Sequence, residues 1–213
     1  MCIIIHRFET NEETTIEDCE SLIRRFVENN LSIIYYDSLP VTSHFQLPND
    51  ALVLTAMSPR NLSQTALQEL WNRRNDINGS LQVINTNLHL VDNPFPQDAI
   101  RNILRIFLNI NGIRIAIASK ILHKERPKLF PIIDKKVMDI YGFPAGKGKY
   151  LEEVIKWIKH MGKDIEGNRN RLGELKNIAE EIARNVYQEL NISFSLVRIF
   201  DIILWQHQQE NEP

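Results

Sequence analysis

Apolar residues recur at helical spacing through most of the chain, and this periodicity is the feature that most limits the fold. In the segment 97–108, four apolar side chains fall on one face: Ile100, Ile103, Leu104 and Phe107. Similar patterns predict helices over 14–29, 51–57, 113–124, 150–161, 170–190 and 193–208, a helix that begins at Ser63, and a short helix from Asp134. We therefore predict an all-α, mainly helical protein with a small N-terminal β element.

Two segments near the N-terminus are instead rich in β-branched residues. The opening MCIIIHRF is apolar but lacks the basic region and cleavage site of a signal peptide, so we interpret it as a strand or a buried tail. The segment 31–40 is β-branched and aromatic and ends at Pro40, which predicts a short strand or an extended arm. Loop signals at 78–80 and 92–96 separate the helices that follow.

The length of 213 residues fits one domain or a domain with an extension. We expect an N-terminal extension (1–30), a helical subdomain (31–96) and a second helical subdomain (97–213). No apolar run reaches the roughly 18 residues that span a bilayer, so we expect a cytoplasmic protein without membrane contact. The net charge of −2 argues mildly against retention on nucleic acid by bulk charge alone, but it leaves local basic patches open.

Histidine and cysteine usage argues against a structural metal. The two cysteines are too few for a four-thiolate iron–sulfur cluster, and the six histidines are scattered without zinc-site spacing.

The most informative stretch is Ile110-Asn111-Gly112-Ile113-Arg114. One predicted helix ends here, a tight glycine turn follows, and an apolar helix begins at once. Gly112 supplies the positive φ that so short a turn requires. The backbone N–H groups at the start of the second helix point outward and form an anion site. These features predict a hairpin that binds phosphate with little dependence on net charge.

This stretch resembles the helix-hairpin-helix of the DNA glycosylase superfamily, whose hairpin reads roughly Leu-Pro-Gly-Val-Gly followed four positions later by alanine. Residues 110–114 occupy the five places and Ala118 the alanine, with Asn111 for proline and Arg114 for the second glycine. In the endonuclease-III-like branch an apolar segment and then a catalytic aspartate follow, and here Asp134 stands 20 residues after Arg114. The chain also looks like an uncharacterised bacterial family related to this superfamily, over roughly residues 35–207.

The resemblance implies a helix-hairpin-helix glycosylase-like fold and a DNA glycosylase that excises a flipped base. Asp134 would be catalytic, because a carboxylate stabilises the positive charge that develops on the sugar. Six residues would bind the DNA backbone: Asn111, Gly112, Ile113, Arg114, Lys120 and Lys136. DNA is the only partner predicted. No cofactor or metal is expected, and a monovalent cation at the hairpin is the one ion left open.

Bifunctional relatives attack the sugar with the amine of a lysine, which forms a Schiff base with it. Ala116 occupies that place, and Lys120, further along the same predicted helix, is expected to point outward. We therefore predict a monofunctional enzyme that leaves an abasic site without cutting the strand.

For the base pocket we nominate Tyr35, Tyr36 and Asp37, because aromatic rings stack on flipped bases and a carboxylate accepts from an exocyclic amine. The alternative is that both tyrosines are strand residues packed on helices. The three tryptophans, Trp71, Trp157 and Trp205, lie on apolar helix faces and are expected in the core.

Basic residues concentrate near the hairpin and the aspartate. They are Arg114, Lys120, Lys124, Arg126, Lys128, Lys135, Lys136, Lys147 and Lys149. Either they face phosphates or they form an ordinary solvated surface.

Three alternatives stay open at this point. Asp134 could simply cap a helix, for which aspartate is a leading residue. The whole protein could be a non-enzymatic helix-hairpin-helix DNA-binding module, or a helical adaptor for other proteins. The first hundred residues match no common repair glycosylase, which leaves room for an unusual substrate such as a hypermodified base in phage DNA. DNA repair and antiviral defence both stay open as the biological role.

Overall fold

The computed structural model describes residues 1–40, 45, 62–143 and 150–211, and helices dominate these residues. The two strands, β1 (Ile3–His6) and β2 (Glu13–Ile16), pair antiparallel with Ile3 opposite Ile16. The prediction of a mainly helical protein with a small N-terminal β element is confirmed. The predicted helix 51–57 and the basic residues Lys147 and Lys149 lie outside the described residues.

Ten helices follow the strands in the described part of the chain. They are α1 (Cys19–Asn29), α2 (Leu31–Ser38), α4 (Gln64–Asn72), α5 (Arg74–Val83), α6 (Gln97–Leu108), α7 (Ile115–Glu125), α8 (Lys135–Ile140), α9 (Leu151–Gly167), α10 (Arg169–Val186) and α11 (Leu196–Asn211).

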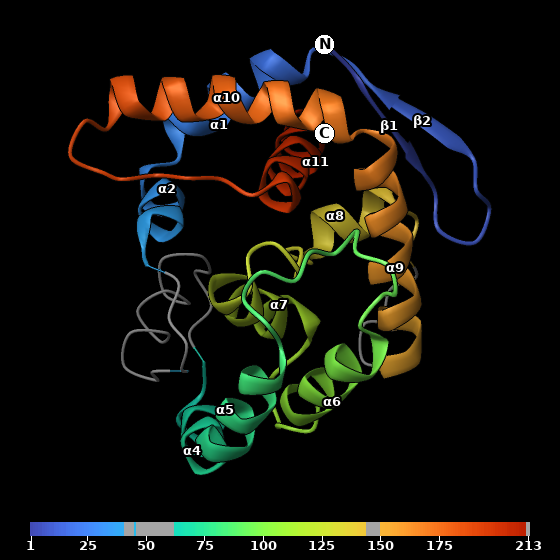
Figure 1. Ribbon diagram of the computed structural model, residues 1–213, viewed down its shortest axis with the longest axis vertical. Coiled ribbons are helices and arrows are strands. Elements are labelled where there is room, and N and C mark those ends of the chain that lie inside the picture. Colours follow the sequence, from blue (N-terminus) through green and yellow to red (C-terminus); the bar gives the residue numbers. More distant parts are fainter. Residues whose placement is uncertain (41–44, 46–61, 144–149, 212–213) are drawn as a thin grey trace.

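The helices form two groups (Figure 1). Helix α1 packs against α10 and α11 at the end of the molecule where both termini lie. Helices α4, α5 and α6 make the opposite end, and α9 runs along one side and contacts α6. Helix α8 packs on α11, between the groups. The N-terminal residues and the last two helices therefore belong to one group; the predicted subdomain boundaries stay a prediction.

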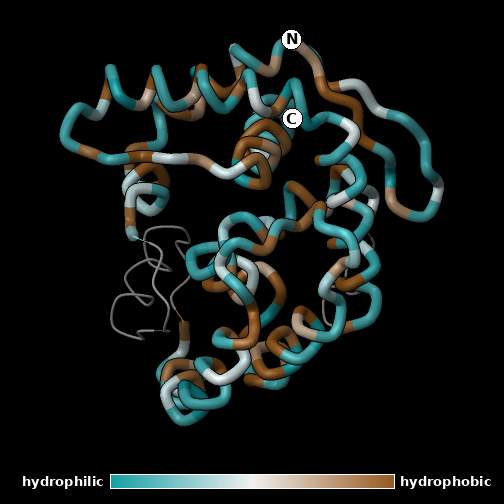
Figure 2. The backbone as a smooth tube through the Cα atoms, viewed as in Figure 1, coloured by the Kyte–Doolittle hydropathy of each residue, from teal (hydrophilic) through white to brown (hydrophobic). Residues whose placement is uncertain are grey.

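Helix α11 is the centre of the group at the termini, where it contacts α1 and α10. Its residues 197–204 are all buried, and the hydropathy colouring in Figure 2 shows the helix mostly hydrophobic. Helix α10 covers it as an amphipathic helix, with Leu172, Leu175, Ala179 and Ile182 inward. No helix of the described residues is both long enough and apolar enough to cross a membrane.

Several local predictions are confirmed. Helix α6 spans 97–108 and buries the four apolar residues of its predicted inner face. Ser63 caps α4, because its side chain accepts a hydrogen bond from the Ala66 N–H at 3.1 Å.

The extended arm predicted at 31–40 is wrong, since residues 31–38 form α2. β-branched residues prefer strands, but this preference is weak and yields to packing. The two strands of the described residues, β1 and β2, pair with each other, and residues 31–38 pair with neither. As a helix the segment satisfies its own backbone while burying Ile34 and Tyr36.

Three further predictions need correction. The loop signal at 78–80 lies inside α5, because burial of Ile77 and Leu81 outweighs the modest helix cost of one glycine. The helix predicted from 14 begins only at Cys19, since residues 13–16 pair with β1. Trp71 is 44% exposed and stacks under the Arg74 guanidinium at 4.4 Å instead of entering the core.

Candidate active site

The predicted hairpin lies between α6 and α7. Gly112 adopts φ of +88°, as the tight turn requires, and the Ile113 N–H closes it on the Ile110 carbonyl at 3.0 Å. Asn111, Gly112 and Arg114 are exposed, whereas Ile113 is buried beneath them. Arg114 is the N-cap residue of α7 but its side chain makes no capping hydrogen bond. This geometry suits an anion held by backbone N–H groups.

Side chains of α7 and α11 hold the segment that leads to Asp134. The Ile133 N–H donates to Ser119 Oγ at 2.9 Å, and the Ile132 N–H donates to Asp201 Oδ2 at 2.8 Å. His123 Nδ1 lies 2.6 Å from the Phe130 carbonyl oxygen. Burial lowers the pKa of His123 to about 3, so the ring is neutral at pH 7 and donates this hydrogen bond. The backbone before Asp134 is therefore fixed by α7 and α11, two helices that are far from each other in the sequence.

Asp134 begins α8 and caps it: Oδ1 accepts from the Val137 N–H at 3.1 Å. The same side chain also lines a cavity of about 70 Å³, which we call the carboxyl cavity. Its apolar walls are Phe26, Ile33, Ile132, Val137 and Trp205, and its polar groups are Lys120, Asp134, Arg198 and Asp201. The capping role predicted as an alternative is thus present, together with a hollow beside the carboxylate.

The carboxyl cavity lies where the two groups of helices meet. Its lining residues come from α1, α2, α7, α8, α11 and the segment that leads into α8. Helix α7 connects it to the hairpin, because this one helix starts at the exposed turn and carries Lys120 into the cavity wall. The expectation that Lys120 points outward is wrong, since residue 120 lies one helical turn beyond Ala116 on a face that packs inward.

The charges in the cavity act on one another. Burial raises the pKa of the Asp134 carboxyl, while the Val137 N–H and Lys120 counteract part of that rise. Burial lowers the pKa of the Lys120 ammonium, against the attraction of Asp134.

A model of a family of unknown function (DUF6308) matches residues 22–208. The chain belongs to this DUF6308 family. The match covers every residue that lines the carboxyl cavity and leaves out the β1–β2 pair. No curated protein and no solved structure matches the chain.

A second hollow, of about 270 Å³, also has Arg198 among its lining residues. We call it the outer pocket; Tyr36, Asp37, His123 and Ser195 are among the residues that line it. Arg198 lines both hollows and is itself buried. Its guanidinium donates hydrogen bonds of 2.7 and 2.9 Å to the two carboxylate oxygens of Asp37.

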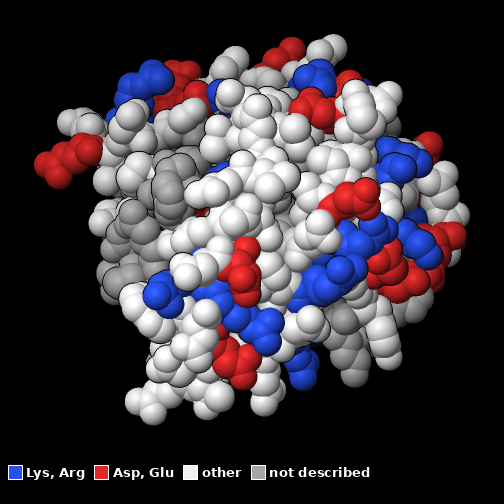
Figure 3. Space-filling view, turned by 60° about the horizontal axis from the view of Figure 1, so that its bottom comes forward, with Lys and Arg blue, Asp and Glu red and all other residues white. Residues whose placement is uncertain are grey.

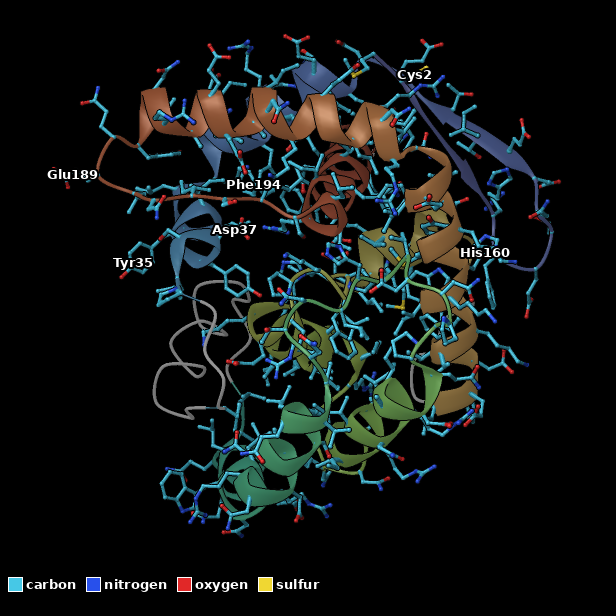
Figure 4. All side chains as sticks on the ribbon, in the orientation of Figure 1. Cys2, Tyr35, Asp37, His160, Glu189 and Phe194 are labelled. Carbon is cyan, nitrogen blue, oxygen red and sulfur yellow. The ribbon has the colours of Figure 1, made fainter. Side chains whose placement is uncertain are left out.

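The residues predicted for the base pocket are only partly brought together. Tyr36 and Asp37 line the outer pocket, whereas Tyr35 is 52% exposed and points away from the molecule (Figure 4). Tyr36 stacks on His123 and donates its hydroxyl to the Lys120 carbonyl at 2.8 Å. Both oxygens of Asp37 bind Arg198. Their role in recognising a base stays a prediction.

The predicted basic cluster is divided between surface and interior. Lys124 and Arg126 are buried, which corrects the expectation that they belong to a basic surface. Lys124 forms a buried ion pair with Glu125 at 3.0 Å, and Arg126 donates to the carbonyls of Leu81 and Ile84. Both long side chains bind groups inside the fold, as buried charges must.

Basic side chains that reach the surface lie among acidic ones (Figure 3). Lys135 pairs with Asp139 at 2.7 Å. The Lys136 ammonium lies 5.7 Å from the centre of the ring of Trp205, which lines the carboxyl cavity. Arg101 pairs with both Asp98 and Glu152. Within the described residues, no group of three or more histidine, cysteine, aspartate or glutamate side chains is placed to hold a metal ion.

Sequence reasoning missed Arg198 and Asp201, the two charged residues of the buried stretch LVRIFDIILW. A signal was present: charged residues three positions apart on an otherwise apolar helix are rarely buried without a partner or a function. Ser119 and His123 carried no comparable signal, because their partners are backbone groups of a loop.

Proposed function

We propose that this protein is a DNA glycosylase that hydrolyses the N-glycosidic bond of a flipped, damaged or modified base. The observation that carries the proposal is the Asp134 carboxylate in a mostly apolar cavity, joined by α7 to an exposed turn suited to phosphate. The hairpin would hold the backbone while the nucleotide rotates out of the duplex, at a cost of a few kcal/mol.

Asp134 would act on the sugar. Departure of the base leaves positive charge on C1′, and a carboxylate stabilises this charge more strongly in a water-poor site than in solvent. The hydrogen bond from the Val137 N–H helps to keep Asp134 ionised despite its burial. Its raised pKa predicts that base release declines as the pH falls through that value.

The first test uses DNA that mimics the charged sugar, so the excised base need not be known. A duplex with a cationic pyrrolidine in place of one nucleotide is compared with a duplex that carries the neutral tetrahydrofuran analogue. The wild-type protein should bind the cationic duplex about 100-fold more tightly, as transition-state mimics bind enzymes. Asp134→Asn should lose this preference while still binding the neutral duplex.

Asp139→Asn is the matched control, because Asp139 lies on the same helix but pairs with Lys135 at the surface. Equal affinity of the wild-type protein for both duplexes would favour the non-enzymatic DNA-binding alternative, which the capping bond of Asp134 also supports. Base release is then sought, with alkali, on duplexes carrying uracil, hypoxanthine, 8-oxoguanine or 3-methyladenine, and on modified against unmodified phage DNA.

Monofunctional action forms part of the proposal, on the strength of Ala116 at the lysine place. Lys120 lines the same cavity, so the proposal is tested with borohydride, which traps an imine between lysine and an abasic site. A trapped complex that disappears in Lys120→Ala would contradict monofunctional action while leaving base excision intact.

A further inference from the structure

Asp201 is a second carboxyl group in the carboxyl cavity, with no role in the function proposed so far. It is 1% exposed, and its Oδ2 accepts the Ile132 N–H. Its Oδ1 is one of two buried side-chain polar atoms without a hydrogen-bond partner among the described residues. An ionised oxygen in this position would be costly, whereas a protonated one can donate to whatever enters the cavity.

The surroundings of Asp201 favour its neutral form. Charged and titratable groups on three helices or at their ends act on it: Arg198 on α11, Tyr36 and Asp37 on α2, and Asp134 and Tyr141 at the two ends of α8. Lys120 of α7 lines the same cavity. Arg198 is the nearest source of positive charge on its own helix, but Asp37 engages it with both oxygens. Burial is the largest cause that raises the pKa of Asp201 well above its usual value, and Asp134 adds to the rise.

We propose that Asp201 is the general acid of the reaction, a protonated carboxyl that donates to the departing base while ionised Asp134 stabilises the sugar. This inference rests on the proposed glycosylase function. Two carboxyl groups held in different charge states by their surroundings are a recurring way to divide acid and base roles.

The step balances without a further reactant. The C1′–N bond breaks and its electron pair goes to the base nitrogen, while the proton on Asp201 Oδ1 moves to the base. A water oxygen bonds to C1′ and gives one proton to Asp134. The products are the free base and an abasic sugar, and return of the proton from Asp134 to Asp201 restores the site.

Asp201→Asn separates this role from a structural one. The carboxamide oxygen still accepts the Ile132 N–H, and the amide stays neutral, but it has no acidic proton to give. Base release should fall about 100-fold or more, the usual contribution of general acid catalysis. The preference for the pyrrolidine duplex should persist, because no negative charge is removed. Asp134→Asn should lose both base release and the preference for the pyrrolidine duplex, whereas Asp139→Asn should keep both.

The outcomes distinguish the two proposals. If the wild-type protein releases bases and Asp201→Asn does so equally well, the general acid is refuted and the glycosylase stands. If Asp201→Asn loses the pyrrolidine preference, Asp201 is ionised and the inference is also refuted. If the wild-type protein neither releases a base nor prefers the cationic duplex, the glycosylase itself falls.

A measurement on the wild-type protein covers the case in which the variant fails to fold. The pH–rate profile of base release should fall on its alkaline side as Asp201 loses its proton. A rate that stays constant up to the pH at which the protein unfolds would overturn the inference.

Discussion

At the scale of single residues, the interior of this protein is notable for charge. The side chains of Arg198 and Asp37 are 6% and 4% exposed, and they join α11 to α2 through two hydrogen bonds. Such a pair contributes little net stability compared with apolar residues of the same volume, but removal of one partner leaves a buried charge without compensation. The pair therefore fixes the position of α2 beside both hollows.

Asp37→Asn should destabilise the fold by about 3–5 kcal/mol, because it removes the charge that compensates buried Arg198. Urea denaturation gives the free energy of unfolding. The control is Glu20→Gln, which removes an exposed partner of Arg24 and should cost at most about 0.5 kcal/mol. Equal losses of unfolding free energy in the two variants would show that the buried pair contributes no more to stability than an exposed one.

At the scale of elements, the hairpin depends on one backbone conformation. Gly112 has φ of +88°, and a Cβ at this position would lie 3.7 Å from Ala66 Cβ, an ordinary contact. The cost of a side chain here is therefore one of backbone conformation and not of collision. Helix α5 contains the opposite case, Gly79, which is exposed on a helix with nothing near its missing Cβ.

Gly112→Ala should destabilise the protein by about 1–2 kcal/mol, the cost of a left-handed backbone with a Cβ. Gly79→Ala should instead stabilise it by about 0.5–1 kcal/mol, since alanine favours a helix. Thermal and urea unfolding of both variants show whether each substitution raises or lowers the free energy of unfolding. If the hairpin grips DNA, only Gly112→Ala should also weaken binding to the tetrahydrofuran duplex; a matching loss in Gly79→Ala would speak against the hairpin.

At the scale of the whole molecule, a polar cluster fastens the strand pair to α9. Asp164 accepts from the His6 backbone N–H at 3.1 Å and from the Tyr141 hydroxyl at 2.9 Å, and its other oxygen lies 2.6 Å from His6 Nδ1. His160 also reaches the His6 carbonyl oxygen, and Figure 4 shows it on α9 facing the strands. The hydrogen bond to Asp164 is the main cause that raises the pKa of His6.

This raised pKa makes global stability depend on pH in a defined direction. The pKa of His6 is near 6.5 in the unfolded chain and higher in the folded protein. The stabilisation from protonated His6 is therefore fully present below about pH 6.5 and is lost as the pH rises through the folded-state pKa. The free energy of unfolding of the wild-type protein, relative to that of His6→Gln, should therefore decrease as the pH rises above about 6.5. A difference that stays constant from below about pH 6.5 up to the alkaline limit of the native state would refute the contribution of His6.

The sequence by itself determined the helical class, the extent of α6, the cap at Ser63 and the positive φ of Gly112. These features follow from local rules: apolar spacing, capping chemistry and the conformational freedom of glycine. Asp134 at the start of a short helix was predictable for the same reason.

Only the tertiary structure decided which residues meet. It made 31–38 a helix, turned Lys120 inward, buried Lys124 and Arg126, and brought Asp201 into the cavity of Asp134 across 67 positions of sequence. Burial and the pairing of buried charges depend on contacts between distant segments, and periodicity along the chain contains no information about them.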